Sequence, residues 1–307
     1  MATLYDVAVI ICSRERATLL SNALRVMRLH TSPAVEVIVV DSASTTDATR
    51  RVALDAGVKY VRTDLKGLSI ARNIGLASTE RQIVVYTDDD CEATPGWIEA
   101  LLPHFSPGVG GVTGLLLDAD AVASTSGPPL FLTRTRQGLD AGHGAIMSFD
   151  RSLLLRIGGF DEVLGTGRTA AGAEDLDIFC RVLREGETIV REPAAAVRHI
   201  YTRDDAAFAE LNRGYGLGLG AMASKWIRFD TLHGMALIGI MIQRGLWRAI
   251  RHRRNRRMRT GAMMLLGGTL IALARYGRHP LNGQCFVDEH PPESIAIVPE
   301  HREPIDG

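Results

Sequence analysis

The sequence predicts an α/β protein with a doubly wound, mostly parallel sheet and a C-terminal helical extension. Short β-branched runs alternate with helix-spaced apolar residues at the spacing of βαβ units. One run ends in three consecutive carboxylates, Asp88 to Asp90, and open α/β sheets bind ligands at the carboxyl ends of their strands. The 307 residues, 46% of them hydrophobic, are enough for one sizeable domain and an appendage.

The expected elements follow in chain order. Apolar β-branched runs predict strands at residues 7–12, 35–40, 58–61, 83–86, 109–117, 145–149 and 194–197. Apolar residues three or four positions apart predict helices at residues 17–29, 47–56, 68–76 and 174–185. Because strand and helix alternate regularly up to residue 90, the strands of this part are expected to be parallel.

Composition and motifs argue against several classes of protein. The first strand leads into Cys12-Ser13-Arg14-Glu15 without a GxGxxG fingerprint, which argues against NAD or FAD. The formal net charge is +0, and the arginine-rich run 251–259 lacks interleaved aromatic residues, so nucleic acid is not an expected partner. The four cysteines lack metal-finger spacing and are expected to be reduced thiols in the cytosol. The N-terminus shows no signal-peptide pattern.

Polar residues gather at the predicted strand ends. Ser13 and Arg14 follow the first strand, Asp41 ends the second, and Asp88 to Asp90 end the fourth, so parallel strands bring them to one crevice. Adjacent carboxylates there suit a divalent cation that holds a phosphorylated ligand, or they form a solvated acidic loop. Asp41 can accept a hydrogen bond from a base or ribose, or cap a turn. Arg72 can balance a diphosphate together with Arg14, or lie on a solvated helix face.

Residues 7 to about 202 resemble the family 2 glycosyltransferases, the inverting group with a GT-A fold. The order and spacing of five short motifs carry this resemblance, although each motif alone is weak. The motifs are Val39–Ser44 with Asp47, Gly67–Gly75, Asp88–Asp90, Gly158–Glu162 and Glu174–Asp177.

The resemblance implies a nucleotide-sugar donor whose diphosphate is held by Mn²⁺ or Mg²⁺. Asp41 would contact the base, Arg72 the base or the diphosphate, and Asp88 or Asp89 the ribose. Asp90 would bind the metal, with Asp88 as a further ligand. A hard dication prefers such oxygen ligands and shares them with a substrate phosphate. His199 follows a strand-like run and would approach the metal or the diphosphate, or have a structural role.

The acidic pair Glu174 and Asp175 opens the helix that Gly186 closes. Carboxylates at a helix N-terminus are favoured by the macrodipole, which is a sufficient structural reason for them. The family resemblance assigns the general base to Asp175, with Glu174 and Asp177 as alternatives. Such a base needs reach to the acceptor hydroxyl more than an unusual pKa.

The chain is expected to divide into a GT-A-like catalytic domain (1–205), a basic helical extension (206–279) and a poorly ordered tail (280–307). Two apolar segments of the extension, 232–242 and 263–274, are shorter than the roughly 20 residues that span a bilayer. With the arginine run between them they suggest an interfacial anchor on the cytoplasmic face of the plasma membrane. The alternative is a soluble helical hairpin packed on the domain.

The expected function is metal-dependent, inverting transfer of a sugar to a hydroxyl of a lipid-linked or cell-envelope glycan. The first alternative is a metal-dependent nucleotidyl- or phosphotransferase on a similar sheet. The second alternative is a non-catalytic sugar-nucleotide-binding or membrane scaffold protein.

Overall fold

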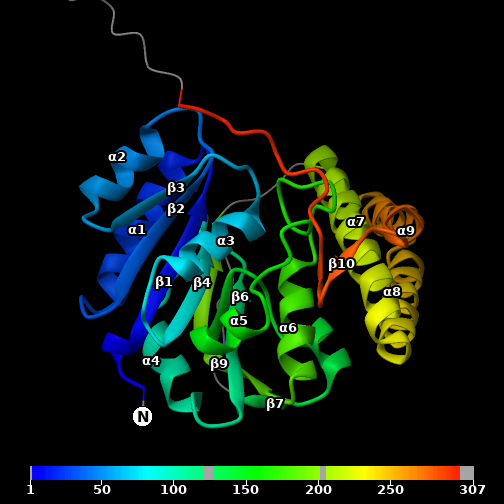
Figure 1. Ribbon diagram of the computed structural model, residues 1–307, viewed down its shortest axis with the longest axis horizontal. Helices are drawn as coiled ribbons and strands as arrows, with labels where there is room; N and C mark the ends of the chain where they lie inside the picture. Colours follow the sequence, from blue (N-terminus) through cyan, green and yellow to red (C-terminus); the bar gives the residue numbers. More distant parts are fainter. Residues whose placement is uncertain (1, 120–126, 201–204, 298–307) are drawn as a thin grey trace, which may run out of the picture.

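The computed structural model describes residues 2–119, 127–200 and 205–297 (Figure 1). Within these residues the main feature is a sheet of nine strands with helices on both faces. The strand order is β3-β2-β1-β4-β8-β6-β9-β5, and β7 pairs with β9 outside this path. A doubly wound, mostly parallel sheet followed by a helical region is the predicted fold class, and it is confirmed.

The first four strands form a parallel half-sheet. β1 lies between β2 and β4, and β3 pairs with the outer edge of β2. In this register Ser13 lies beside Asp41, and Cys12 lies beside Asp88, so the polar residues share one edge. The strands are β1 (Val7–Ser13), β2 (Glu36–Ser42), β3 (Lys59–Thr63) and β4 (Ile83–Asp88).

The other half of the sheet is mixed. β8 runs antiparallel between β4 and β6, β6 and β9 are parallel, and β5 and β7 are antiparallel to β9. The β5–β9 pairing places Cys91 beside His199, which brings this histidine to the aspartates. The strands are β5 (Cys91–Ala93), β6 (Val109–Leu117), β7 (Leu130–Leu132), β8 (Ile146–Asp150) and β9 (Thr188–His199).

Alternate strand residues face two hydrophobic cores, as the period of a strand requires. Val9 and Ile11 face α1, α2 and α4, whereas Ala8 and Ile10 face α3, α5 and α6. The helices are α1 (Ala17–His30), α2 (Ala48–Asp55), α3 (Leu68–Ala77), α4 (Trp97–Leu101), α5 (Arg151–Arg156) and α6 (Glu174–Arg184). Single 3₁₀ turns occur at Leu4–Asp6 (η1) and Leu102–His104 (η2), and a longer one at Thr135–Asp140 (η3).

The C-terminal region forms three long helices beside α6 (Figure 1). They are α7 (Asp205–Phe229), α8 (Thr231–Arg251) and α9 (Arg256–Tyr276). A third core joins them to the loop before α6, with Trp226 of α7 and Leu164 of the loop fully buried. The extension is therefore packed on the sheet domain, as in the hairpin alternative. The sides of its helices that face away from the domain are still exposed and can contact a membrane surface.

A buried charge network fastens α7 to α6. The ammonium of Lys225 donates to Asp161 Oδ2 at 2.6 Å and to Asp177 Oδ2 at 2.9 Å. The Asp177 carboxylate also accepts from Arg181 Nε at 2.9 Å and from Trp226 Nε1 at 3.0 Å. These five side chains are buried, so removal of one charge leaves its partners without compensation in a poorly hydrated site.

The expectation of a poorly ordered tail is wrong for residues 280–297. A hairpin of β10 (Leu281–Asn282) and β11 (Cys285–Phe286) buries the Phe286 ring, and the Phe286 N–H donates to Asp161 Oδ2 at 2.9 Å. Further on, Ile295 N donates to the Asp64 carbonyl at 2.9 Å. One buried ring and a few backbone bonds fix a segment whose polar composition suggests disorder. Residues 298–307 lie outside the described residues.

Candidate active site

A cavity of about 770 Å³ lies at the carboxyl edge of β1, β2 and β4. This volume is typical of small-molecule sites, which run from about 300 to 1,000 Å³. Among the predicted site residues, Asp41 and the alternative base Asp177 do not line it. The predicted residues on its lining are Ser13, Arg14, Arg72, Asp88, Asp89, Asp90, Glu174, Asp175 and His199.

Three aspartates, Asp88 to Asp90, lie where β4 ends and the chain turns into β5. Ser13 Oγ donates to Asp89 Oδ2 at 2.7 Å. Loss of hydration raises the pKa of Asp89 to about 6, although the Ser13 hydroxyl and Arg16 act against it. Loss of hydration also raises the pKa of Asp88, and the neighbouring Asp90 and Asp175 raise it further against the effect of Arg72. The cluster therefore favours a cation.

Arg16 is a site residue that the sequence analysis missed. At the start of α1, its guanidinium forms ion pairs with Asp89 Oδ1 at 2.7 Å and with Asp90 Oδ2 at 2.5 Å. Arg14, which the analysis chose, also lines the cavity, and its buried Nε lacks a hydrogen-bond partner within the described structure. Both arginines directly follow the first strand, and this position was the available signal.

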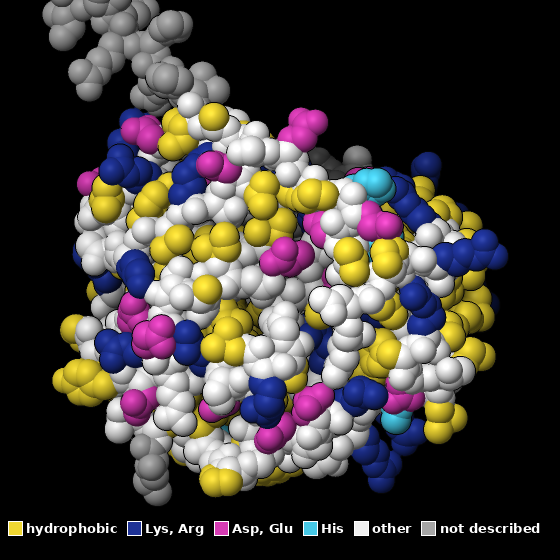
Figure 2. Space-filling model, viewed as in Figure 1, with side chains coloured by type: hydrophobic (Ala, Val, Ile, Leu, Met, Phe, Trp, Pro, Cys, Tyr) yellow, Lys and Arg dark blue, Asp and Glu magenta, His cyan; other side chains and the backbone are white. Residues whose placement is uncertain are grey.

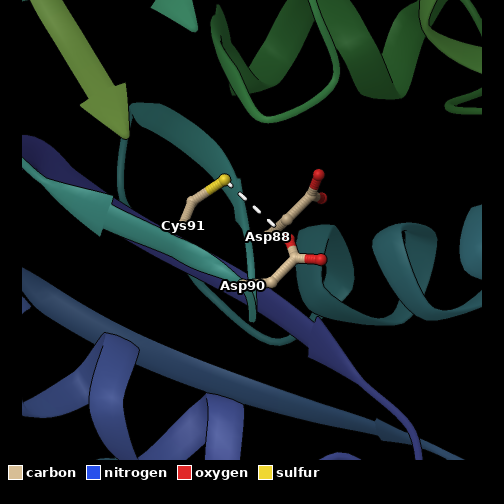
Figure 3. A group of neighbouring side chains, drawn as sticks. All are labelled: Asp88, Asp90 and Cys91. Atoms are coloured by element: carbon tan, nitrogen blue, oxygen red, sulfur yellow. Dashed lines mark hydrogen bonds between the residues drawn. The ribbon is translucent and has the colours of Figure 1, made fainter. Parts of the chain in front are cut away.

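Asp88, Asp90 and Cys91 offer atoms that lie within 4.8 Å of one another (Figure 3). Asp88 is the last residue of β4 and Asp90 lies in the turn that follows, and Cys91 Sγ donates to Asp90 Oδ1 at 3.9 Å. Two oxygen donors suit Mn²⁺ or Mg²⁺, which complete their shells with water and phosphate. Burial raises the pKa of the Cys91 thiol, and a hard dication prefers oxygen to sulfur, so the two carboxylates are the better ligands. The residues present therefore fit a hard dication held by carboxylates.

Two predicted residues lie next to the aspartates. His199 Nε2 is 3.5 Å from Asp90 Oδ2, a position that follows from the β5–β9 pairing. Arg72 is buried, donates from Nη1 to Glu174 Oε1 at 2.9 Å and lies 3.7 Å from Asp88 Oδ1. Its solvated-helix alternative is wrong, because Arg72 bridges the carboxylates of β4 and α6.

Glu174 and Asp175 open α6, as predicted, but their surroundings differ. Asp175 is partly exposed, and its Oδ2 accepts from Gly144 N at 2.9 Å. Glu174 is buried, and loss of hydration together with Asp175 raises its pKa to about 7, against the effect of Arg72. Asp175 is thus the more accessible carboxylate of the pair.

Two residues of the matching motifs point away from the cavity. Asp177, an alternative base in the sequence analysis, belongs to the buried network of Lys225, so that alternative is wrong. Asp41 is fully buried; Ser44 N and Tyr60 OH each donate to its carboxylate at 2.9 Å, and Arg62 Nη1 lies at 3.5 Å. The neighbouring Ser42 lines the cavity instead.

The helical extension also lines this cavity, which the sequence analysis did not foresee. We call this set the helical wall and the acidic set around the strand ends the acidic wall. The helical wall consists of Leu211, Tyr215 and Leu219 of α7, Met241, Arg244, Gly245 and Arg248 of α8, and Leu265 of α9. The acidic wall consists of Asp88, Asp89, Asp90, Glu174 and Asp175.

The sheet order and the acidic edge define a GT-A-like α/β protein. The same fold occurs in the mannosyltransferase PcManGT from Pyrobaculum calidifontis, solved in complex with GDP-Man and Mn²⁺. That structure matches 89% of this chain and 86% of its own, with a TM-score of 0.57 and 21% identity. The match thus extends over most of the chain.

Residues 8–155 match the family model described as Glycosyl transferase family 2. This match confirms the resemblance found in the motifs for that part of the chain. The pre-mycofactocin glycosyltransferase of Mycobacterium tuberculosis is 28% identical over 213 residues, which are 63% of this chain and 42% of that protein. The glucosyl-dolichyl phosphate glucuronosyltransferase of Haloferax volcanii is 25% identical over 218 residues, or 63% of this chain and 68% of that protein.

Proposed function

We propose that the protein is a metal-dependent, inverting glycosyltransferase that moves a sugar from a nucleotide-diphosphate donor to a hydroxyl of a lipid-linked or cell-envelope glycan. The observation that supports this most is that Asp88, Asp90 and Asp175 line one cavity. A metal site and a partly exposed base are thus available to one bound substrate pair.

The donor side of the proposal rests on the acidic wall. Asp88 and Asp90 would hold Mn²⁺ or Mg²⁺, with His199 beside them. When bound, the ion stabilises the charge on the departing nucleoside diphosphate. Arg14 brings a buried Nε that lacks a hydrogen-bond partner among the described residues, and a phosphate oxygen would supply one. The fold neighbour was solved with GDP-Man and Mn²⁺, which is consistent with such a donor.

The proposed chemistry needs one proton acceptor. Asp175 takes the proton of the acceptor hydroxyl, whose oxygen attacks the anomeric carbon as the bond from that carbon to the phosphate oxygen breaks. The bonding electron pair leaves with the nucleoside diphosphate, and the configuration inverts. Gly144 N, which donates to Asp175 Oδ2 at 2.9 Å, holds the carboxylate in place.

The extension supports a membrane-proximal acceptor. In the described part of the chain, no helix combines the length and apolarity that crossing a bilayer requires. Hydrophobic side chains nevertheless gather along the edge formed by α8 and α9, with arginines among them (Figure 2). Trp247 is 58% and Ile250 68% exposed. Such a surface suits peripheral binding to anionic lipid. Trp247→Glu should reduce co-sedimentation with anionic vesicles, and unchanged sedimentation would contradict this.

Product analysis tests the proposed function. The full chain is incubated with Mn²⁺, a panel of nucleotide sugars and lipid-linked acceptors. Release of nucleoside diphosphate together with a new glycoside of inverted configuration supports the proposal. Pyrophosphate release would instead identify a nucleotidyltransferase. Metal-dependent donor binding without any product would identify a sugar-nucleotide-binding scaffold protein.

A further inference from the structure

The residues of the helical wall form ordered helix faces. On α8, Met241, Arg244, Gly245 and Arg248 are spaced i, i+3, i+4 and i+7, which places them on one side of the helix. On α7, the three lining residues are spaced four apart, from Leu211 to Leu219. Each of these two helices thus turns one continuous side toward the cavity. This regular spacing indicates that the helical wall is a defined surface of the cavity.

Glycines fix the position of α7 in this wall. A Cβ on Gly216 would lie 2.1 Å from the Leu265 carbonyl oxygen of α9, and one on Gly220 would lie 2.2 Å from that of Thr269. On the other side, a Cβ on Gly218 would lie 2.2 Å from the Gly172 carbonyl oxygen. The backbone of α7 is therefore held between α9 and the loop before α6, so the side chains it presents have fixed positions.

The two arginines of the helical wall differ in their partners. Arg244 Nη2 pairs with Asp140 Oδ2 at 2.8 Å. The Arg248 side chain is exposed, and its guanidinium forms no ion pair or hydrogen bond with any residue that the structure describes. Apolar side chains line the same cavity, namely Leu211, Leu219, Met241 and Leu265. A cavity lined by both an unpaired guanidinium and hydrocarbon groups is complementary to an anion joined to a hydrocarbon chain.

The surface next to Arg248 is also apolar. Leu246, Trp247 and Ile250 flank it on α8 and are between 51% and 68% exposed. A hydrocarbon chain whose anion is held by Arg248 can therefore continue onto apolar surface. The diphosphate of a donor, in contrast, would be neutralised at the acidic wall by the metal, so Arg248 remains for a second anion.

We propose that the helical wall is the acceptor subsite and that it binds a lipid phosphate. Arg248 binds the phosphate, the apolar side chains of α7, α8 and α9 bind the hydrocarbon chain, and the hydroxyl-bearing sugar beyond the phosphate reaches Asp175. This inference rests on the proposed function, because it assigns the acceptor of the same reaction. It selects the lipid-linked class over a free cell-envelope glycan.

Binding of octyl phosphate, used below its micelle concentration, tests the inference on the full chain. Calorimetry should show that octyl phosphate binds at least about tenfold more tightly than octanol or inorganic phosphate, because charge and chain both contribute. Arg248→Ala should weaken octyl phosphate binding about tenfold. Arg254→Ala, an exposed arginine between α8 and α9 outside the cavity lining, should leave it unchanged.

Three outcomes would overturn the inference: equal binding of octanol, equal binding of inorganic phosphate, or full affinity in Arg248→Ala. Thermal unfolding of each variant checks that it is folded. A second variant tests the proposed function separately. Asp90→Ala should lose metal-dependent binding of the nucleotide sugar but keep its affinity for octyl phosphate. If wild type binds octyl phosphate through Arg248 but never binds a nucleotide sugar, the proposed function fails and the lipid-phosphate site stands.

Discussion

The acidic wall and the helical wall border one cavity but are built in different ways. The acidic wall consists of residues at the ends of strands and at the start of α6, and their positions follow from the sheet register. The helical wall consists of helix faces whose position depends on glycine contacts and on the buried network of Lys225. The residues of the acidic wall belong to short motifs that are visible in the sequence, whereas the residues of the helical wall come together only in the folded protein.

The largest effect is expected from a change that affects only the acidic wall. Asp175→Asn removes the proposed base and keeps its shape, so turnover should fall by about 10² to 10⁴. Affinity for the nucleotide sugar, measured by calorimetry with Mn²⁺, should stay within about twofold, because the base contacts the acceptor. Turnover equal to wild type would remove Asp175 from this role.

The second change tests whether the two walls depend on each other. Lys225→Met leaves Asp161 and Asp177 buried with less compensation, so the free energy of unfolding should fall by about 3 to 5 kcal/mol. The exposed ion pair of Lys59 with Glu36 provides a matched control, and Lys59→Met should cost less than about 1 kcal/mol. Equal stability of both variants in denaturant titrations would show that the buried network does not hold the helical wall.

The third change uses the raised pKa of Glu174, which is about 7 in the folded protein and 4.5 in its unperturbed form. Between these values the folded state keeps a proton that the unfolded state has lost, so stability falls as pH rises through this window. From pH 5 to 8 wild type should lose about 1 to 3 kcal/mol more than Glu174→Gln.

Glu99→Gln, at an exposed position of α4, provides the control for this pH dependence. It should keep the wild-type slope of unfolding free energy against pH. Parallel slopes for wild type and Glu174→Gln would contradict the assigned shift.

The smallest effect is expected at the edge of the acidic wall. Arg16 neutralises Asp89 and Asp90, so Arg16→Ala should raise the affinity for Mn²⁺ in the absence of donor by about fivefold, as expected for one partly exposed charge. Arg25→Ala, an exposed arginine of the same helix, should have no effect. A weaker Mn²⁺ affinity in Arg16→Ala would show that Arg16 supports the metal site.

The same contrast explains what the sequence could predict. Strand ends were predictable because apolar runs fix the strands and parallel pairing then brings their ends together, as for Ser13 and Asp88. Tertiary partners were not predictable. Asp41 has the expected place on the sheet, yet Tyr60 and Arg62 of the neighbouring strand occupy its carboxylate.

Residues of one sequence motif can also lie in different parts of the folded protein. Asp175 and Asp177 lie two positions apart, so helical geometry directs one toward the cavity and the other toward α7. The glycine run of α7 was visible in the sequence, but its purpose depends on α9 and the Gly172 loop, which are distant in the chain. Helix–helix contacts of this kind leave no local signal.

The close glycine contacts that position α7 suggest which residues of this helix can be changed. Its attachment uses backbone atoms, buried charges and core side chains such as Trp226, whereas positions 211 and 215 contribute side chains to the cavity. We therefore expect libraries at these two positions to change acceptor preference while the protein keeps its melting temperature. The cavity side of α7 could then be varied to obtain new products of the proposed sugar transfer.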